Sequence, residues 1–252
     1  MNYQEKIQLL AELLEKSTCT FALTGAGIST ESGIPDFRSP GSGLWSKHDP
    51  AEVASVSAFM RNPAAFYELN MQWWNEYLFN AEPGPTHLAL ARLEKKRLLA
   101  GVITQNIDGL HQKAGSQKVY EVHGHLRTCH CISCNASHPF AFLVSQFDSG
   151  QNPPRCERCH GVLRPDVVLF EDPLGEDFFY ANRDLTRCRL LIAIGSSLQV
   201  YPVAALPEKV RQLVIINRDA TPWDGEAELV INNEQAGKVL TDTLSVLGKN
   251  KT

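Results

Sequence analysis

Two Cys-x-x-Cys pairs lie near the middle of this 252-residue chain, Cys131 with Cys134 and Cys156 with Cys159. Twenty-one residues separate the pairs, close to the spacing of a zinc ribbon, in which two knuckles present four thiolates to one tetrahedral ion. Four thiolates close the coordination sphere, so we expect a structural zinc with no open position for substrate. The surrounding segment, 125–165, has too little apolar sequence to fold alone, and the metal is expected to hold it together.

Cys129 lies two residues before Cys131 and offers a different pairing. His130 and His160 are further ligands that the spacing allows. A Cys-x-Cys pair is less suited to a metal knuckle than Cys-x-x-Cys, which favours Cys131 over Cys129 as the first ligand. The residues alone leave these ligand sets open.

The flanks of this segment alternate between short apolar blocks and stretches of helical length. Apolar side chains recur at helical spacing over residues 3–16 and 86–99. Strands are expected at 20–24, 101–105, 166–170, 189–194, 212–216 and 227–231. This alternation predicts an α/β fold with a doubly wound, parallel, Rossmann-like sheet. Residues 39–84 are rich in aromatic side chains and do not fit that sheet, so we expect a separate helical module there.

A glycine turn follows the first expected strand. Residues 20–24 lead directly into Gly25-Ala26-Gly27, with Ser29 two positions later. A strand, a glycine turn and a helix start can bring backbone N–H groups up to a diphosphate. The pattern departs from the dehydrogenase fingerprint and is weak by itself. More specific is the run Gly-Ile-Pro-Asp-Phe-Arg at 33–38, which joins a turn, a carboxylate, an aromatic ring and a guanidinium.

A polar run, Thr-Gln-Asn-Ile-Asp at 104–108, follows the second expected strand, and His123 comes fifteen residues after Asp108. The ends of parallel strands are where ligands bind in open α/β sheets. Amide, carboxylate and imidazole groups arriving there supply hydrogen bonds, an anchor and a general base. The competing interpretation is a helix cap or turn followed by an ordinary loop histidine.

Taken in order, these motifs resemble the sirtuins, a family of NAD-dependent protein deacylases. The matching runs are Gly-Ala-Gly-Ile-Ser at 25–29, residues 33–38, residues 104–108, His123-Gly124, Gly-Ser-Ser-Leu at 195–198 with Val200 and Pro202, and Asn217 with Asp219 and Thr221. The resemblance covers about residues 5–245. It implies transfer of an acyl group from lysine to ADP-ribose with release of nicotinamide.

The resemblance also assigns roles to single residues. His123 is expected to be the base that removes a ribose hydroxyl proton, which suits an imidazole with an ordinary pKa of about 6.5. Asn106 is the second expected catalytic residue, beside the nicotinamide. The implied cofactor contacts are Gly25, Ala26, Gly27, Ser29, Asp36, Phe37, Arg38, Gln105, Ile107, Asp108, Gly195, Ser196, Ser197, Asn217 and Asp219.

The same resemblance divides the chain. Residues 1–36, 85–124 and 166–252 are expected to form the NAD-binding domain, residues 37–84 a helical insertion with a mobile cofactor loop, and residues 125–165 the zinc ribbon. The family's register places the first zinc ligand eight residues after the histidine, at Cys131, which leaves Cys129 as a spare.

Two departures from the family bear on the substrate. Sirtuins that remove succinyl or malonyl groups carry a Tyr and, three residues on, an Arg that binds the acyl carboxylate. Here Tyr67 is followed at that spacing by Asn70, whose uncharged amide cannot make the bidentate ionic contact. We therefore expect neutral acyl groups, acetyl first.

The second departure is Glu171, which stands where the family usually has the glycine of Phe-Gly-Glu. That position lies where the substrate peptide adds as a strand, beside Val168 and Phe170. Glu171 brings a side chain and a negative charge to a place of close backbone approach. We expect weaker peptide binding or a bias toward basic sequences.

Composition narrows the binding partners and the cellular location that we expect for this chain. A net charge of −4 gives no drive toward nucleic acid or anionic membranes, and the longest apolar run is far below a membrane span. We expect a soluble, cytoplasmic monomer that acts on acylated-lysine proteins. The second candidate activity is mono-ADP-ribosylation at the same NAD site. A non-catalytic NAD sensor would have lost His123 or Asn106, and a dehydrogenase lacks its fingerprint here.

Overall fold

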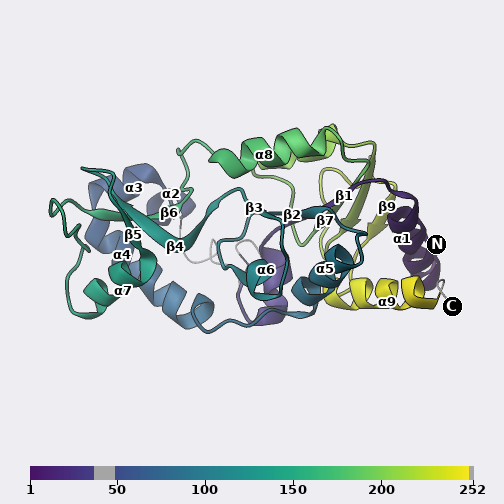
Figure 1. Ribbon diagram of the computed structural model, residues 1–252, viewed down its shortest axis with the longest axis horizontal. Coiled ribbons are helices and arrows are strands. Elements are labelled where there is room, and N and C mark those ends of the chain that lie inside the picture. Colours follow the sequence, from purple (N-terminus) through teal and green to yellow (C-terminus); the bar gives the residue numbers. More distant parts are fainter. Residues whose placement is uncertain (37–48, 250–252) are drawn as a thin grey trace.

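The computed structural model describes residues 1–36 and 49–249. It contains a six-stranded sheet in the order β3-β2-β1-β7-β8-β9 and a three-stranded sheet in the order β5-β4-β6. The two sheets lie in separate halves of an elongated molecule (Figure 1). The described residues include no helix that is both long and apolar enough to cross a bilayer.

The large sheet is parallel throughout. Its strands are β1 (Thr20–Thr24), β2 (Gly101–Thr104), β3 (Val119–Glu121), β7 (Leu190–Ile194), β8 (Gln212–Ile216) and β9 (Leu229–Ile231). The central strands β1, β2 and β7 are buried along their whole length, as expected when both faces of a parallel sheet are covered. The predicted doubly wound α/β sheet is confirmed.

Helices cover both faces of this sheet. On one face lie α1 (Tyr3–Lys16), α5 (Pro85–Lys95) and α9 (Ala236–Lys249), which share a hydrophobic core with the even-numbered residues of β1, β2 and β7. On the other lie α8 (Glu176–Leu185) and the 3₁₀ helix η4 (Val203–Lys209), packed on the odd-numbered residues. Figure 1 shows α8 and α9 on opposite sides of the strands.

The carboxylate of Glu31 joins three parts of this layer. It accepts hydrogen bonds from the backbone N–H of Thr86 at 3.0 Å and its hydroxyl at 2.8 Å. It also accepts one from the backbone N–H of Gly237 at 2.9 Å. These donors lie in the first turns of α5 and α9, where N–H groups lack partners within the helix. Glu31 belongs to the 3₁₀ helix η1 (Ala26–Ser32) that follows the glycine turn, so η1 is fixed against both helices.

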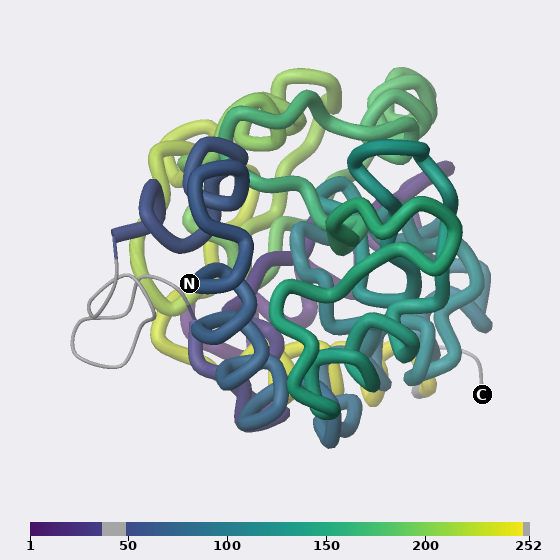
Figure 2. Tube along the Cα trace, turned by 90° about the vertical axis from the view of Figure 1, so that its left-hand side faces the viewer, coloured from purple at the N-terminus to yellow at the C-terminus, as the bar shows by residue number. Residues whose placement is uncertain are grey.

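The smaller half combines two segments of the chain. It contains the helices α2 (Pro50–Val53), α3 (Val56–Arg61) and α4 (Pro63–Trp73), followed by a π-helical turn (Trp74–Leu78). It also contains β4 (Gly124–Cys131), β5 (Ser137–Pro139), α7 (Phe140–Asp148) and β6 (Leu163–Val167). Side chains from both segments form one hydrophobic core. Figure 2 shows the helices of the first segment, in blue, beside the green trace of the second. The domain boundaries remain a proposal.

One strand prediction is wrong. Residues 166–170 were expected in the parallel sheet, but the strand there is β6, which pairs antiparallel with β4 in the small sheet. Its side chains alternate between buried and half-buried positions, the pattern of a strand with one covered face rather than two. The short strand β3, by contrast, extends the parallel sheet where no strand was predicted.

Strand register brings the predicted motifs together. Thr24 at the end of β1 lies opposite Thr104 of β2 and Ile194 of β7, and β8 ends in register with β7. The chain therefore leaves four neighbouring strands at one edge, at Gly25, Gln105, Gly195 and Asn217. The short helix α6 (Leu110–Lys113) follows the polar run on the same side.

Candidate active site and metal centre

A cavity of about 1090 Å³ lies at this edge, between the parallel sheet and the smaller half. Most of the predicted site residues line it, namely Gly25, Ala26, Gly27, Ser29, Asp36, Asn70, Gln105, Asn106, Ile107, Asp108, His123, Val168, Phe170, Glu171, Gly195, Ser196, Ser197, Asn217 and Asp219. Phe37 and Arg38, with the expected cofactor loop that contains them, lie outside the described residues.

The glycine turn crosses a second glycine at the cavity floor. The N–H of Gly27 donates to the carbonyl oxygen of Gly195 at 2.9 Å. A Cβ atom on Gly25 would stand 2.8 Å from that oxygen, and one on Gly27 would stand 2.8 Å from the Cα of Gly195. The Gly195 backbone has a φ of +59°. Because these positions lack side chains, the backbones of the glycine turn and of Gly195 can both come close to a ligand. A bound diphosphate requires such close approach by backbone N–H groups.

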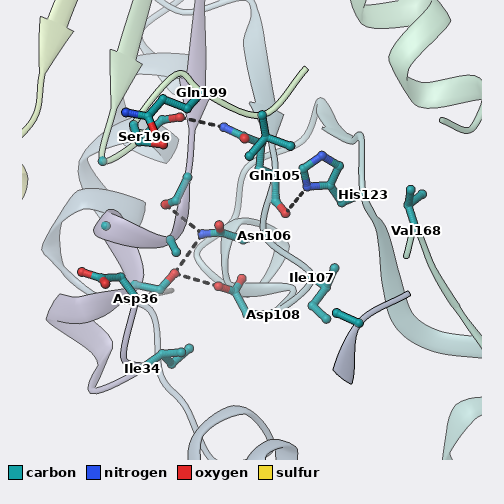
Figure 3. A pocket seen from close by; sticks show the side chains of 18 of the residues that line it. Ile34, Asp36, Gln105, Asn106, Ile107, Asp108, His123, Val168, Ser196 and Gln199 are labelled. Carbon is teal, nitrogen blue, oxygen red and sulfur yellow. Dashed lines mark hydrogen bonds between the residues drawn. The ribbon is translucent and has the colours of Figure 1, made fainter. Parts of the chain in front are cut away.

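Three polar side chains form a buried network beside this crossing. The amide nitrogen Nδ2 of Asn106 donates to the hydroxyl of Ser29 at 3.0 Å and to the carbonyl oxygen of Gly25 at 3.2 Å. The Ser29 hydroxyl donates to Asp108 at 2.7 Å, and the other Asp108 oxygen accepts the N–H of Leu110 at 3.0 Å. Figure 3 shows these side chains meeting below Gln105. The network fixes the Asn106 amide, and no residue among 1–36 and 49–249 donates a hydrogen bond to its oxygen, which can accept one from a ligand.

His123 faces the cavity from the turn before β4. Its Nδ1 lies 3.1 Å from the carbonyl oxygen of Gln105 (Figure 3). A carbonyl can only accept, so Nδ1 carries the proton and the neutral ring presents the lone pair of Nε2. Burial lowers the pKa of His123 from its ordinary value, and the backbone hydrogen bond opposes that shift only in part. The ring is therefore a neutral acceptor at physiological pH.

Gln105 links this histidine to the far side of the site. Its side-chain amide donates to the hydroxyl of Ser196 at 2.9 Å, and its backbone carbonyl holds His123. Farther along the same edge, Arg218 lies 3.8 Å from the carboxylate of Asp36 and 3.2 Å from that of Asp219. Arg218 was not predicted, because an arginine after a strand carries no motif of its own.

The smaller half supplies the apolar wall. Phe66, Trp74, Leu78, Val168 and Phe170 line the cavity, a surface suited to an aliphatic chain. The backbone N–H of Val168 donates to the carbonyl oxygen of His123 at 2.8 Å. This bond fixes the wall against the turn that carries the histidine.

Tyr67 lies away from the cavity that it was expected to line, whereas Asn70 lines it as expected. The Tyr67 ring is fully buried in the smaller core and its hydroxyl donates to the carbonyl oxygen of Leu163 at 2.5 Å. It does not reach the cavity, and its expected contact with the acyl group is withdrawn. Asn70 does line the cavity, but its Nδ2 donates to the carbonyl oxygens of Val53 at 3.2 Å and Phe66 at 2.9 Å. Its donors are thus used within the protein.

The four predicted cysteines come together, all four sulfur atoms lying within 4.8 Å of one another. The sulfurs of Cys131 and Cys159 are 3.4 Å apart, and those of Cys134 and Cys156 are 3.7 Å apart. A tetrahedral zinc with bonds of about 2.3 Å separates its sulfurs by about 3.8 Å. The cluster therefore fits a zinc ion.

The two knuckles are built alike. In each, the first cysteine sulfur accepts a backbone N–H from two residues on, at 3.4 Å for Cys131 and 3.3 Å for Cys156. In each, the residue after the second cysteine has a left-handed backbone, with φ of +56° at Asn135 and +59° at His160. His160 is thus part of the knuckle backbone rather than of the metal-binding group.

Cys129 and His130, which the spacing also allowed as zinc ligands, have different partners. Cys129 is fully buried, its thiol lies near the carbonyl oxygens of His138 and Pro139, and burial raises its pKa to about 12. His130 contacts Asp166 at 2.6 Å. One neighbour of the cluster was missed: the Nε2 of His138 lies 3.3 Å from the sulfur of Cys156. No spacing rule points to it.

The Sir2 family model matches residues 25–202, which is more than half of the chain. The chain belongs to the Sir2 family. The predicted resemblance is thereby confirmed, and the matched range contains the glycine turn, the polar run, the histidine, the cysteines and the segment after β7.

Relatives of this Sir2 chain match over nearly their whole length. It is 49% identical to NAD-dependent protein deacetylase 2 of Caldanaerobacter subterraneus, covering 93% of each protein. It is 43% identical to NAD-dependent protein deacylase 2 of Archaeoglobus fulgidus, covering 94% of each. A Sir2 structure with a deacetylated p53 peptide and 3′-O-acetyl-ADP-ribose aligns with a TM-score of 0.88 and 37% identity, over 96% of this chain and 99% of that one.

Two buried histidines below the Sir2 site were also missed. The Nε2 of His111 lies 2.9 Å from the hydroxyl of Thr24, and its ring packs against His87 with centroids 4.9 Å apart. Burial, and next the neighbouring His87, lower the pKa of His111 to about 3. Burial is also the main cause that lowers the pKa of His87. Both rings are therefore neutral core groups. A histidine on an apolar helix face gives no sequence signal that separates this role from a surface one.

Proposed function

We propose that this chain is an NAD-dependent protein-lysine deacylase that removes acetyl groups first. The observation that carries the proposal is the orientation of His123, whose free Nε2 faces the same cavity as the glycine crossing and the Asn106 network. Such a reaction needs a base, a backbone that binds diphosphate and a polar pocket for nicotinamide. The names of the relatives support the same activity.

The residues divide the work among them. The backbone around Gly25, Gly27 and Gly195 holds the diphosphate, while Ser196 and Asn217 lie where the adenosine ribose would extend. Asn106, held by Ser29 and Asp108, positions the carboxamide of nicotinamide. NAD bound there would supply the ribose carbon that the acyl oxygen attacks while the bond from that carbon to nicotinamide breaks and nicotinamide leaves. The apolar wall would hold the acyl-lysine chain beside that carbon, where a near-attack distance of about 3 Å is required.

The Nε2 atom of His123 then accepts a proton from a ribose hydroxyl. After this transfer both ring nitrogens carry a proton. The carbonyl oxygen of Gln105 stabilises the positive ring by accepting the hydrogen bond from Nδ1. The four cysteines and their zinc lie in the smaller half and take no part in proton transfer. Cys131 and Cys156 share a core with Val167 and Leu169, the neighbours of Val168 and Phe170 in the wall, so the zinc would support the wall.

The position of the Asn70 amide favours substrates with neutral acyl groups. With Nδ2 occupied by Val53 and Phe66, the group left to the cavity is the amide oxygen, which repels a carboxylate. Acetyl and other uncharged chains meet no such penalty.

The test is incubation of the pure protein with NAD and a panel of acyl-lysine peptides, followed by mass analysis of all products. Deacylated peptide, nicotinamide and O-acyl-ADP-ribose in equal amounts are the expected result. ADP-ribose attached to protein, with the acyl-lysine intact, would establish the transferase activity instead.

A further inference from the structure

Glu171 occupies a turn that normally holds glycine. The N–H of Asp172 donates to the carbonyl oxygen of Leu169 at 3.1 Å, which closes a β-turn with Glu171 at its third position. Its φ is +79°, the value a type II turn requires there and one that L-residues avoid. The backbone thus keeps a glycine conformation although a glutamate stands in place, so other contacts must stabilise it.

Those contacts come from Ser57, in the first turn of α3. The carboxylate oxygen Oε2 of Glu171 accepts the backbone N–H of Ser57 at 2.9 Å and its hydroxyl at 2.7 Å. The neighbouring backbone is joined as well, since the N–H of Phe170 donates to Ala54 at 2.8 Å and the N–H of Val56 donates to Phe170 at 3.1 Å. The glutamate side chain is therefore held in one position at the cavity rim.

The charge at that position has no cationic partner among residues 1–36 and 49–249. The hydrogen bonds from Ser57 hold the pKa of the Glu171 carboxyl below its usual value, so it is ionised at neutral pH. Its neighbour Asp172 is paired with Arg164, whereas Glu171 takes part in no ion pair within those residues. Both bonds to Ser57 use Oε2, which leaves Oε1 able to accept a further donor.

Glu171 also stands close along the chain to the wall that contacts His123. It lines the cavity three residues beyond Val168, whose N–H is bonded to His123. Three extended residues would span about 10 Å, and the β-turn over 169–172 brings Glu171 nearer to Val168 than that. An extended peptide whose acyl-lysine lies beside Val168 brings a residue two or three positions away to the same place.

We propose that Glu171, positioned by Ser57, selects protein substrates that carry a lysine or arginine two or three residues from the acylated lysine. This inference rests on the proposed deacylase function. A fixed carboxylate loses little side-chain freedom when it binds a cation, so the contact contributes to affinity although the rim is exposed. An acidic residue at the same peptide position is repelled.

The test uses matched acetyl-lysine peptides that differ at one position, with lysine, alanine or glutamate two or three residues from the acetylated lysine on either side. The parent protein should favour the lysine peptide over the alanine peptide by about two- to fivefold in kcat/KM, the range that an exposed ion pair supplies. The difference should lie mainly in KM and shrink at high salt.

Three variants separate charge from position. Glu171→Gln keeps an acceptor for Ser57 but removes the charge. The ratio of kcat/KM for the lysine peptide to that for the alanine peptide should therefore fall to about one. Ser57→Ala keeps the charge but removes one of its two anchors, so the ratio should fall only partly. Glu171→Gly removes both charge and anchor and should match Glu171→Gln in its ratio.

A lysine preference that persists in Glu171→Gln, or a parent protein that does not distinguish the three peptides, overturns the proposal. In both cases normal turnover of the alanine peptide leaves the deacylase function intact. Absence of deacetylated product from every peptide would instead contradict the proposed function itself.

Discussion

At the scale of single residues, the site depends on one proton. The carbonyl oxygen of Gln105 fixes the proton of His123 on Nδ1, so that the catalytic nitrogen is a lone pair before any ligand binds. Buried hydrogen bonds fix Asn106 in the same way. Catalysis by such groups requires little reorganisation, because their geometry is set by the protein.

We expect His123→Ala to lower the turnover rate by about 10²–10⁴-fold, the usual contribution of a general base. NAD affinity should change little, because the diphosphate is held by the glycine crossing rather than by this ring. Single-turnover kinetics and NAD binding measured by calorimetry on the same sample check both statements. Equal losses of affinity and rate would contradict the assignment.

The same residue sets the acid limit of activity. Burial lowers the pKa of His123 below its ordinary value of about 6.5, so the ring becomes protonated only as the pH falls below that value. Activity should therefore decline as the pH falls, with the midpoint of the decline below about 6.5. A profile of kcat/KM measures this limit. A midpoint above 6.5 would show that a group other than His123 controls the reaction.

At the scale of elements, the apolar wall depends on how α4 meets α2. The side-chain amide of Asn70 in α4 donates a hydrogen bond to the carbonyl oxygen of Val53 at the end of α2. Tyr67 points into the core. Asn70→Arg should therefore not create a desuccinylase, because the Tyr67 hydroxyl is too far inside the core to assist the new cation and the tie to Val53 would be lost. Succinyl-lysine turnover should stay below about a tenth of acetyl-lysine turnover in the parent protein, because a buried carboxylate there lacks its ionic partner. The variant should not close this gap.

Asn70→Asp is the matched control, since it keeps the size of the side chain but loses the donors to Val53 and Phe66. Acetyl-lysine turnover should fall in this variant through loss of the wall's position. Efficient removal of succinyl groups by the parent protein, measured with the same peptides, would overturn this account of the pocket.

The sequence predicts the parallel sheet because its central strands are uninterrupted apolar blocks, and it predicts the site because polar residues follow those blocks directly. The prediction fails for β6. Its residues alternate between buried and half-buried positions, but the apolar run at its end resembles a fully buried parallel strand. The prediction fails for Tyr67, because the direction of a side chain around a helix depends on tertiary packing. Short β3 and the buried histidines carry too weak a pattern to be recognised.

At the scale of the whole molecule, the two halves depend on each other. Cys131 and Cys156 are buried in the core that also contains side chains of α3 and α4, and Cys134 packs against it. Strand β6 leads from that core to Val168 at the cavity. Metal binding in the smaller half therefore supports the cavity wall without contributing a ligand to the reaction. Loss of zinc should lower activity through loss of structure.

We expect one zinc ion per chain, and we expect serine in place of any one of the four cysteines to yield protein that is unstable or insoluble, because thiolate zinc sites contribute directly to folding free energy. Cys129→Ala is the matched control, since this buried thiol is outside the cluster. It should keep its zinc and lose about 1 kcal/mol of stability. Metal content by atomic emission, together with thermal unfolding, checks both results. Loss of zinc in Cys129→Ala, with zinc retained after replacement of Cys134, would show that a different set of cysteines binds the metal.

The contact between His138 and the cluster makes a separate prediction. His138→Ala should keep zinc at saturation, because all four thiolates remain. It should release the ion to a chelator about 10–100-fold more readily, since it removes a group that contacts the sulfur of Cys156 and that orients this ligand. The rate of zinc transfer to a coloured chelator measures the effect, with Cys129→Ala as the comparison. Equal release rates in His138→Ala and the parent protein would show that the imidazole packs beside the cluster without supporting it.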